Sequence, residues 1–421
     1  MLNHSINRLN EQDCNTVENT ANNIEHNNHH TEQLRPVAKR SESNLNETNL
    51  SETKLTETQQ SERKASKLNK SILITPEQLK QQLIVSPFTK TFIKDSQKAI
   101  KSIINNQDDR LVVIIGPCSI HDPIAALDYA KQLKLMSNSF SQELLIVMRV
   151  FLEKPRTTLG WKGLINDPHL DQSYDVNEGL YNSRKLLLAI NELGLATATE
   201  FLNINVASHI SDLISWGAIG ARTSQSQSHR ELASSFGFPI GFKNTTDGNT
   251  QIAIDAITSA KESHTLYLPN NQGQMSICTS VGNKSSHLIL RGGKQPNYSQ
   301  QSIHNACQQL KKAKHLSRVM VDCSHSNSDK DHLKQKLVAS DIANCIKQGE
   351  QSVFGLMIES FLVEGRQSLS DITKLTYGQS TTDACINLEQ SHDILTILAE
   401  AIKNRREKKA DIPPILSANT G

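Results

Sequence analysis

A polar stretch at residues 151–168, FLEKPRTTLGWKGLINDP, combines cations, hydroxyl groups and glycines. Guanidinium, ammonium and hydroxyl groups bind phosphate and carboxylate oxygens, and glycine lets a backbone approach such a ligand closely. Cations elsewhere in the chain weaken the alternative of a solvated charged loop, and a cluster of them requires ligands with several negative charges, such as phosphates. The side chains that we expect to converge are Arg149, Lys154, Arg156, Arg222, Lys243 and Arg291, with Thr157 beside them.

A second chemical grouping could bind a metal ion. Cys118, His325, Glu359 and Asp383 offer one sulfur, one nitrogen and two carboxylates. Mixed ligands of this kind suit Mn, Fe, Co or Zn, whereas Mg and Ca require oxygen ligands. Spacing alone leaves open the alternative that the cysteine and the histidine are structural.

These side chains lie at or just past the ends of short apolar runs. The run LVVIIG before Pro117 and Cys118 is typical of a strand buried on both faces, as in parallel sheets. Eight such runs alternate with segments of helical periodicity, which predicts a (β/α)8 TIM barrel with all strand ends at one mouth. A doubly wound sheet, the alternative, would not gather all eight ends. The predicted end residues are Cys118, Arg149, Glu200, Arg222, Lys243, Arg291, Asp322 with His325, and Glu359.

Composition narrows the class of protein. The 421 residues carry a net charge of +2 and no long basic stripe with interleaved aromatic residues, so we expect no nucleic-acid partner. We also expect no membrane segment, because no run of 18 apolar residues and no secretory signal occurs. Seven scattered cysteines do not form a disulfide framework. Together these features predict a soluble, cytoplasmic protein.

The chain divides into three predicted parts. Residues 1–70 are of low complexity and are expected to be disordered, as a solvated extension rather than a partner-binding tail. The catalytic domain is expected at 71–408 and a flexible tail at 409–421. Additions to the barrel are a helix starting at Pro76, an amphipathic helix at Thr91–Asn105 and a β-hairpin at Thr265–Ser280. The amphipathic helix must bury its isoleucines against the barrel or another subunit.

Eight motifs between residues 71 and 406 resemble the type I 3-deoxy-D-arabino-heptulosonate 7-phosphate (DAHP) synthases. They are GPCSIHD, MRVFLEKPRTTLGWKGLINDP, GARTSQSQSHRELAS, GFKNTTDG, LRGGKQPNY, DCSHSNS, ESFLVEG and TTDAC. The resemblance implies condensation of phosphoenolpyruvate with erythrose 4-phosphate, the first step of the shikimate route. Both substrates are anions, as the cation cluster requires.

The resemblance also assigns roles to residues. It implies a divalent metal on Cys118, His325, Glu359 and Asp383, with Lys154, Arg149 and His325 as catalytic residues. The metal would polarise the aldehyde for attack by the enol carbon. Arg156 and Thr157 would contact the sugar phosphate. The phosphoenolpyruvate site would comprise Arg149, Lys154, Arg222, Lys243 and Arg291, with Glu200 as a further substrate-binding residue.

The chain also departs from the family pattern. Thr245 replaces a glycine, which predicts backbone strain, and Asn203, Ala207 and Ser208 alter a region that borders the family's pocket for aromatic amino acids. These changes favour altered or lost inhibition, whereas Gly237 favours tyrosine over phenylalanine as effector because it leaves room. The resemblance further predicts a homodimer or homotetramer. A related synthase acting on arabinose 5-phosphate and a catalytically inactive sensor of aromatic amino acids are the alternative functions.

Overall fold

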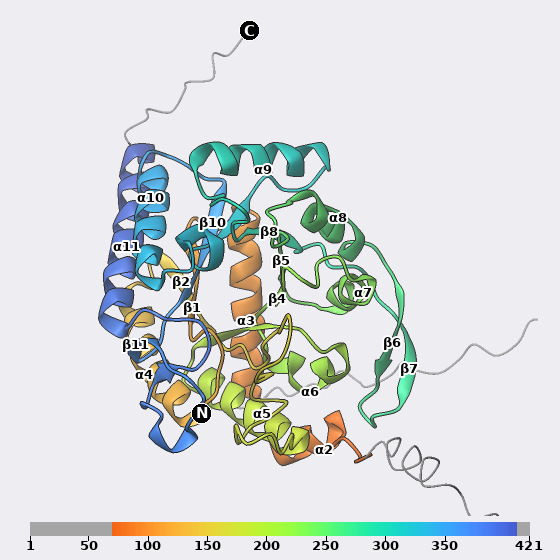
Figure 1. The fold of residues 1–421 in the computed structure, drawn as a ribbon. Coiled ribbons are helices and arrows are strands. Elements are labelled where there is room, and N and C mark those ends of the chain that lie inside the picture. The colour runs from red at the N-terminus through yellow and green to blue at the C-terminus, as the bar shows by residue number, and fades with distance from the viewer. Residues whose placement is uncertain (1–69, 411–421) are drawn as a thin grey trace, which may run out of the picture. The chain divides into compact units, whose positions relative to one another are not determined.

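The computed structural model describes residues 70–410, of which Ser71 onward belongs to one compact unit. Eight parallel strands close into a barrel in the order β1-β10-β9-β8-β5-β4-β3-β2, and a helix follows each strand (Figure 1). The predicted (β/α)8 barrel is therefore confirmed. Its strands are β1 (Leu111–Gly116), β2 (Leu144–Arg149), β3 (Ala196–Glu200), β4 (Trp216–Ile219), β5 (Ile240–Lys243), β8 (His287–Leu290), β9 (Val319–Asp322) and β10 (Val353–Glu359).

The helices around the barrel follow the strands in chain order. Asp122 caps the first of them, and Pro123 occupies its first turn, as predicted. The eight helices are α4 (Pro123–Ser139), α5 (Val176–Glu192), α6 (Ala207–Ile210), α7 (Gln227–Ser235), α8 (Gln251–Ala260), α9 (Gln300–Lys312), α10 (Gln335–Lys347) and α11 (Leu388–Ala410). The last helix extends two residues into the predicted C-terminal tail. Otherwise the predicted tails, at 1–69 and 411–421, lie outside the described residues.

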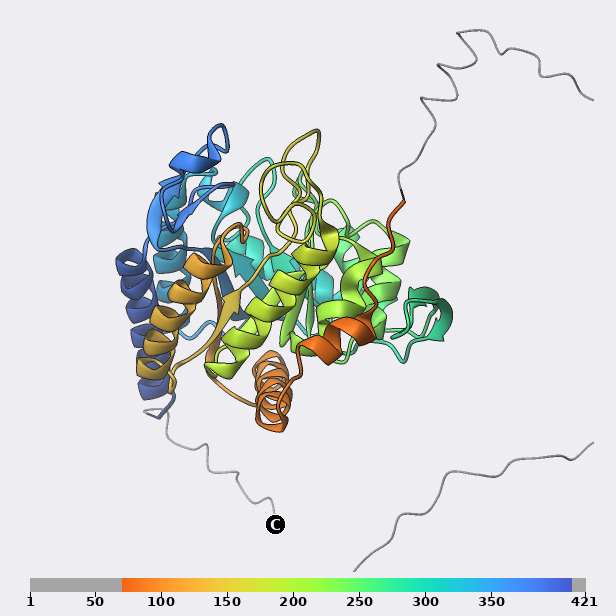
Figure 2. The same cartoon turned by 90° about the horizontal axis from the view of Figure 1, so that it is seen from below.

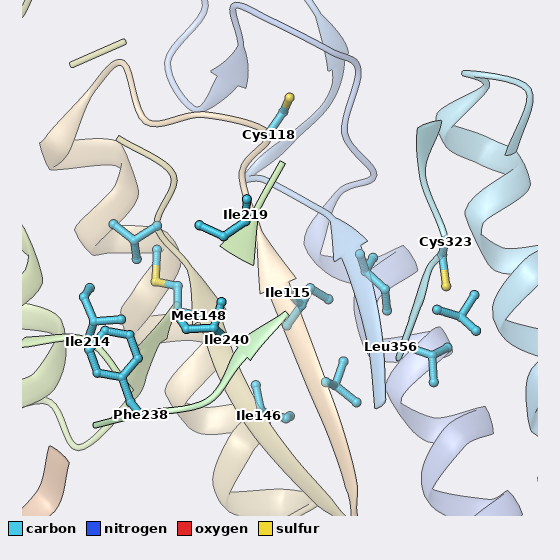
Figure 3. Packing of buried hydrophobic residues seen from close by; sticks show 14 of the residues in the cluster. Ile115, Cys118, Ile146, Met148, Ile214, Ile219, Phe238, Ile240, Cys323 and Leu356 are labelled. Carbon is cyan, nitrogen blue, oxygen red and sulfur yellow. The ribbon is translucent and has the colours of Figure 1, made fainter. Parts of the chain in front are cut away.

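Side chains of the strands alternate between two apolar layers. In β1, Val112 and Ile114 point into the barrel, whereas Val113 and Ile115 belong to the layer between the strands and the surrounding helices. Figure 3 shows part of this outer layer, in which Ile115, Ile146 and Met148 lie close to one another. Both faces of the strands are buried, so most strands are apolar runs; β3, ATATE, is the exception, with Thr197 and Thr199 buried as well.

Helix α3 (Pro87–Ile104) closes the N-terminal end of the barrel. Ile100, Ile103 and Ile104 are buried in the same cluster as the interior residues of the strands, and Figure 2 shows α3 at the end opposite the loop that follows β2. The isoleucine face of α3 is thus buried against the barrel, which is one of the two predicted alternatives. The helix starts four residues before the predicted Thr91, because Ser86 accepts a hydrogen bond from Thr89 N and Pro87 favours the first turn.

Helix α2 (Pro76–Gln82) precedes α3 and begins at the predicted proline. Thr75 and Gln78 form a reciprocal capping box there. The predicted hairpin is present as β6 (Thr265–Pro269) paired antiparallel with β7 (Met275–Thr279). A second small sheet, β11 (Val363–Arg366) with β12 (Gln379–Ser380), was not predicted.

The strain expected at Thr245 is absent, so that prediction was wrong. Thr245 is not among the described residues with positive φ, and its one hydroxyl hydrogen is shared between Asp247 Oδ1 and the carbonyl of Asn249. A threonine therefore satisfies this turn with a shared side-chain hydrogen bond that a glycine could not make. Membrane-spanning candidates are also absent: none of the helices within 70–410 is long and apolar enough to cross a bilayer.

Candidate active site

A cavity of about 590 Å³ opens at the carboxyl ends of the barrel strands. Every residue that the sequence nominated for a site lines it, including Thr157 and Glu200. Eight arginines and lysines but only four carboxylates line the wall, so the cavity has an excess of positive charge that suits anionic ligands. The basic residues are Arg149, Lys154, Arg156, Arg222, Lys243, Arg291, Lys330 and Arg366, and the acidic ones are Glu153, Glu200, Glu359 and Asp383.

Strand ends position most of these side chains. Arg149, Glu200, Lys243 and Glu359 are the last residues of β2, β3, β5 and β10. Parallel strands direct their carboxyl ends to one mouth, so residues distant in sequence meet there. Cys118 follows β1 by two residues, and Figure 3 shows it beyond the end of that strand.

Three of the four predicted metal ligands come together. One atom each from Cys118, Glu359 and Asp383 lies within 4.8 Å of the other two. The Lys154 ammonium contacts this group, with Nζ 2.9 Å from Cys118 Sγ and 2.7 Å from Asp383 Oδ2. Burial raises the pKa of Asp383, but Lys154 outweighs that effect and lowers it overall. Burial, followed by the charge of Glu359, raises the pKa of Cys118 to about 11.

His325 lines the same cavity but is not part of the three-residue group. Its Nδ1 lies 3.0 Å from Asp322 Oδ2 and 2.7 Å from Ser324 Oγ. A hydrogen bond from Nδ1 to a carboxylate leaves Nε2 available, which is the usual arrangement of a metal-binding histidine. His325 also has a φ of 59°, a left-handed conformation that costs a residue with a Cβ about 1–3 kcal/mol and is frequent at functional sites.

The cations differ in how strongly the protein already binds them. Arg149 is 2% exposed; its Nη2 donates to Glu359 Oε1 at 3.0 Å, and its guanidinium stacks on Phe151. Lys243 donates to Asp322 Oδ2 at 2.9 Å. These two cations and the Lys154 ammonium are each paired with a carboxylate in or beside the cavity.

Two other cations retain unused donors. Among the described residues the Arg291 guanidinium makes only long hydrogen bonds, 3.4 Å to Gly292 O and 3.5 Å to Ser326 Oγ, and Arg222 is exposed. Burial lowers the pKa of Arg291; Asp322 opposes this shift and Arg222 adds to it. The two guanidinium groups therefore repel each other, and an anion that contacts both would relieve the repulsion.

Glycines hold the polar loop after β2 in shape. Gly163 has a φ of 108°, and a Cβ there would lie 2.4 Å from Leu152 O. Gly160, with a φ of 136°, packs against Arg156, whose Nε donates to Trp161 O at 2.8 Å. The close backbone approach that the sequence suggested for ligand binding thus also serves the fold of the loop itself.

Several residues of the site were missed by sequence reasoning. Asp322 was noted only as a strand end, yet its carboxylate is fully buried and bridges Lys243 and His325. Gln335 contacts both backbone groups of Glu359: its Nε2 donates to Glu359 O at 2.9 Å, and its Oε1 accepts from Glu359 N at 2.8 Å. The position of Asp322 at the end of β9 was a usable signal, whereas nothing in the sequence indicates that Gln335 on α10 reaches β10. Other wall residues not nominated are Glu153, Lys330, His332 and Arg366.

Comparison with known proteins agrees with the motifs. Residues 78–396 match the model of the "DAHP synthetase I family". Trp-sensitive phospho-2-dehydro-3-deoxyheptonate aldolases from Enterobacter agglomerans and Escherichia coli are each 50% identical over 333 residues, or 79% of this chain and 96% of theirs. The solved structure of phospho-2-dehydro-3-deoxyheptonate aldolase from Francisella tularensis has a TM-score of 0.79 and 47% identity, covering 80% of this chain and 99% of its own. The chain therefore belongs to the type I DAHP synthase family, whose activity is the first step of aromatic biosynthesis.

Proposed function

We propose that the cavity condenses phosphoenolpyruvate with erythrose 4-phosphate and water to give DAHP and phosphate. The observation that carries the proposal is the excess of cations over carboxylates in a single cavity of about 590 Å³ at the barrel mouth. Phosphoenolpyruvate carries a phosphate and a carboxylate, and the sugar carries a second phosphate. Several separate cationic contacts are therefore needed to hold both substrates in register for carbon–carbon bond formation.

The two substrates, phosphoenolpyruvate and erythrose 4-phosphate, would bind to different parts of the cavity wall. Arg222 and Arg291, with unused donors and mutual repulsion, are suited to the phosphate of phosphoenolpyruvate, and Lys243 lies beside them at the end of β5. Arg149 and Lys154 complete that site. Arg156 and Thr157 lie on the exposed loop after β2 and are suited to the phosphate of the sugar.

Cys118, His325, Glu359 and Asp383 would hold a divalent metal ion. The fit rests on the donor set: a thiol and two carboxylates meet within 4.8 Å, and the Lys154 ammonium lies against Cys118 Sγ and Asp383 Oδ2. Sulfur and nitrogen donors favour Mn, Fe, Co or Zn. When bound, the metal supplies Lewis-acid polarisation of the sugar aldehyde.

Protein side chains handle the remaining charge and protons. The pKa of Lys154 is raised: burial opposes the shift, but the neighbouring Cys118 and Asp383 outweigh it. Lys154 is therefore an ammonium that can donate a proton to the aldehyde oxygen as the enol carbon of phosphoenolpyruvate bonds to the aldehyde carbon. Water then adds to the cationic carbon left behind and gives one proton back to Lys154. The carbon–oxygen bond to the phosphate breaks, the remaining hydroxyl becomes the ketone of DAHP, and its proton leaves with the phosphate. Arg149, held by Glu359 and Phe151, stabilises negative charge without moving.

An aromatic amino acid is the proposed feedback inhibitor, and tryptophan is now favoured over the tyrosine expected from sequence. The curated relatives described above are named Trp-sensitive. A Cβ at Gly237 would meet nothing within 4 Å, so the space beside it does not select tyrosine against the larger indole. Phe201, Phe236 and Phe238 pack together next to this glycine. Phe201 and Phe238 are buried, so of these three rings the half-buried Phe236 is the one that a ligand beside Gly237 could contact. Separate titrations of tryptophan, tyrosine and phenylalanine decide the effector, and inhibition by tyrosine at the lowest concentration would restore the first expectation.

A homodimer or homotetramer is proposed from the outer face of the hairpin. Tyr267, Met275 and Ile277 are 66%, 63% and 75% exposed and share one face of β6 and β7. Light scattering should show an oligomer that Ile277→Asp dissociates. Leu135→Asp on α4, at a leucine that is 62% exposed, is the control and should leave the mass unchanged. A monomeric parent chain would contradict this proposal.

Phosphate release with both substrates and added Mn(II) tests the proposed reaction. Turnover should require erythrose 4-phosphate, and arabinose 5-phosphate should not replace it. Chelation should abolish turnover, and Mn, Co or Fe should restore it. Arg222→Ala should lower kcat/KM for phosphoenolpyruvate and Arg156→Ala that for the sugar, each by about 10- to 150-fold, the equivalent of about 1.5–3 kcal/mol. No turnover with any metal would favour the inactive sensor, and equal effects of both variants on both substrates would refute the division of the wall.

A further inference from the structure

A second, much smaller cavity lies at the opposite end of the barrel from the active site. Its walls come from α3, α8, β8 and the segment between α9 and β9. Its volume of about 10 Å³ is room for roughly one water-sized particle. The residues around it are Ile104, Ile257, Lys261, Lys284, Ser286, His287, Leu310, His315, Leu316 and Arg318.

The cavity wall carries three cations and no carboxylate, although the charge of Glu350, outside the wall, acts to raise the pKa of Arg318. Lys261, Lys284 and Arg318 line it, and within residues 70–410 none of the three forms an ion pair with a carboxylate. Burial and then the charge of Lys284 lower the pKa of Lys261. Burial, followed by Arg405, lowers the pKa of Arg318 to about 10. Cations that are crowded and partly desolvated in this way are stabilised by an anion among them.

One buried donor in the wall has no partner. Ser286 is 5% exposed, and its hydroxyl makes no hydrogen bond within the structure. Such a group costs about 1–3 kcal/mol unless a water or an ion satisfies it. It therefore points independently to an occupant of the cavity.

The hydrogen bonds of the neighbouring histidines favour an anion over a water molecule. His287 accepts from Trp216 Nε1 at 3.2 Å, and its Nδ1 lies 3.0 Å from Ser285 O, so both ring nitrogens are used. His315 Nδ1 lies 3.1 Å from Lys261 Nζ, and its Nε2 lies 2.9 Å from Thr258 Oγ1. Arg318 Nε donates to Gln351 O at 2.9 Å and its Nη1 to the carbonyls of Ile103 and Ile104, so its Nη2 is the donor left for a ligand. The wall thus offers N–H and O–H donors but no unused imidazole acceptor. A halide only accepts and can use several of these donors at once, whereas a water needs an acceptor for each hydrogen that it donates.

We propose that this cavity is a binding site for a monatomic anion, chloride in the cell, held by Lys261, Arg318 and Ser286. Phosphate is too large for the space. The exposed Lys284, whose Nζ donates to Lys261 O at 2.9 Å, covers the site and can move to admit the ion. Because α3, α8, β8 and the segment before β9 meet here, the ion would stabilise the closed end of the barrel, remote from the chemistry.

Thermal unfolding at matched ionic strength tests the site, with sodium bromide or chloride compared against sodium gluconate, whose anion does not fit. We expect the halides to raise Tm in a saturable manner by about 2–4 °C. Lys261→Gln and Ser286→Ala should each reduce this increment, and the second variant serves if the first does not fold. Lys311→Gln, at an exposed lysine in the last turn of α9, should retain it and so controls for general salt effects.

Anomalous scattering from crystals soaked in bromide gives the second readout. A peak in the cavity that disappears in Lys261→Gln supports the site. Density without an anomalous signal would identify the occupant as water. That result, or an equal halide increment in the parent chain and both variants, would overturn the proposal.

Discussion

Replacing Asp322 with Asn should separate the electrostatic role of this carboxylate from its shape. Asp322 is fully buried at the end of β9 and contacts Lys243 Nζ at 2.9 Å and His325 Nδ1 at 3.0 Å. Burial raises its pKa, but Lys243 and then His325 outweigh that effect and hold it well below its usual value. At neutral pH the side chain is therefore an anion that orients one proposed substrate ligand and one proposed metal ligand.

The loss of activity in Asp322→Asn should be large because Lys243, the partner of Asp322, is only 3% exposed. An asparagine oxygen can still accept a hydrogen bond from Lys243, but the charge is gone. Losing a charge-assisted hydrogen bond costs about 1.5–3 kcal/mol, and truncating one partner of a buried pair costs about 3–5 kcal/mol. We expect kcat/KM for phosphoenolpyruvate to fall by about 10- to 150-fold, and the bound metal to be lost at lower chelator concentration, since His325 also loses its carboxylate.

Steady-state kinetics and chelator titration of Asp322→Asn give the two readouts. The folded pKa lies below the ordinary 3.8, so the stabilising charge is complete above that value and disappears only on further acidification. The kinetic deficit should consequently be constant from about pH 6 to 8. Asp393→Asn, which breaks the surface pair of Asp393 with Lys336, is the matched control and should change neither readout. If a folded Asp322→Asn enzyme kept kcat/KM within twofold of the parent, the bridging role assigned to Asp322 would be refuted.

Three further outcomes are expected. Gly163→Ala should lower the free energy of unfolding in urea by more than about 1 kcal/mol, because Gly163 has positive φ and no space for a Cβ, whereas Gly237→Ala should not. Burial lowers the pKa of His287 from 6.5 to about 4, so the free energy of unfolding should fall by about 3 kcal/mol as the pH falls between these values. In His287→Gln this loss of stability with pH should be smaller. A loss as large as in the parent chain would contradict the role assigned to His287. Thr245→Gly should destabilise the turn before α8, because the shared side-chain hydrogen bond disappears, and unchanged urea unfolding would show that it contributes nothing.

The barrel could be predicted because its signal is local. Most strands are short apolar runs, and a polar or charged residue stands at the end of each strand or within a few positions after it. The number of strands and the end of the barrel that carries the functional residues could therefore be predicted together. The start of α3 was misplaced because the signal at Ser86 and Pro87 is a cap, whereas the prediction followed the isoleucine periodicity that begins later. The amphipathic stripe required a buried partner but could not specify the barrel end rather than another subunit.

Pairings within the site could not be predicted in the same way. The sequence identified the cations and carboxylates of the site by residue type. The pairing between them depends on the order of the strands around the barrel. Lys154 meets Asp383 across 229 positions of sequence, and Arg149 meets Glu359 across 210. Asp383 is delivered by the loop after β12, in a small sheet whose short strands carry no apolar signal.

These pairings connect the two proposed halves of the site. Lys154 is bound to Asp383, Arg149 to Glu359, and Lys243 to Asp322, which also contacts His325. Two proposed metal ligands, Asp383 and Glu359, are thus neutralised by Lys154 and Arg149, which are proposed to bind phosphoenolpyruvate. A third cation of that proposed site, Lys243, neutralises Asp322, the carboxylate that supports the ligand His325. A divalent ion on the carboxylates would replace part of that neutralisation, which leaves the cations freer to contact the substrate. The metal and phosphoenolpyruvate should therefore bind cooperatively, and substitutions within one pair should be less than additive.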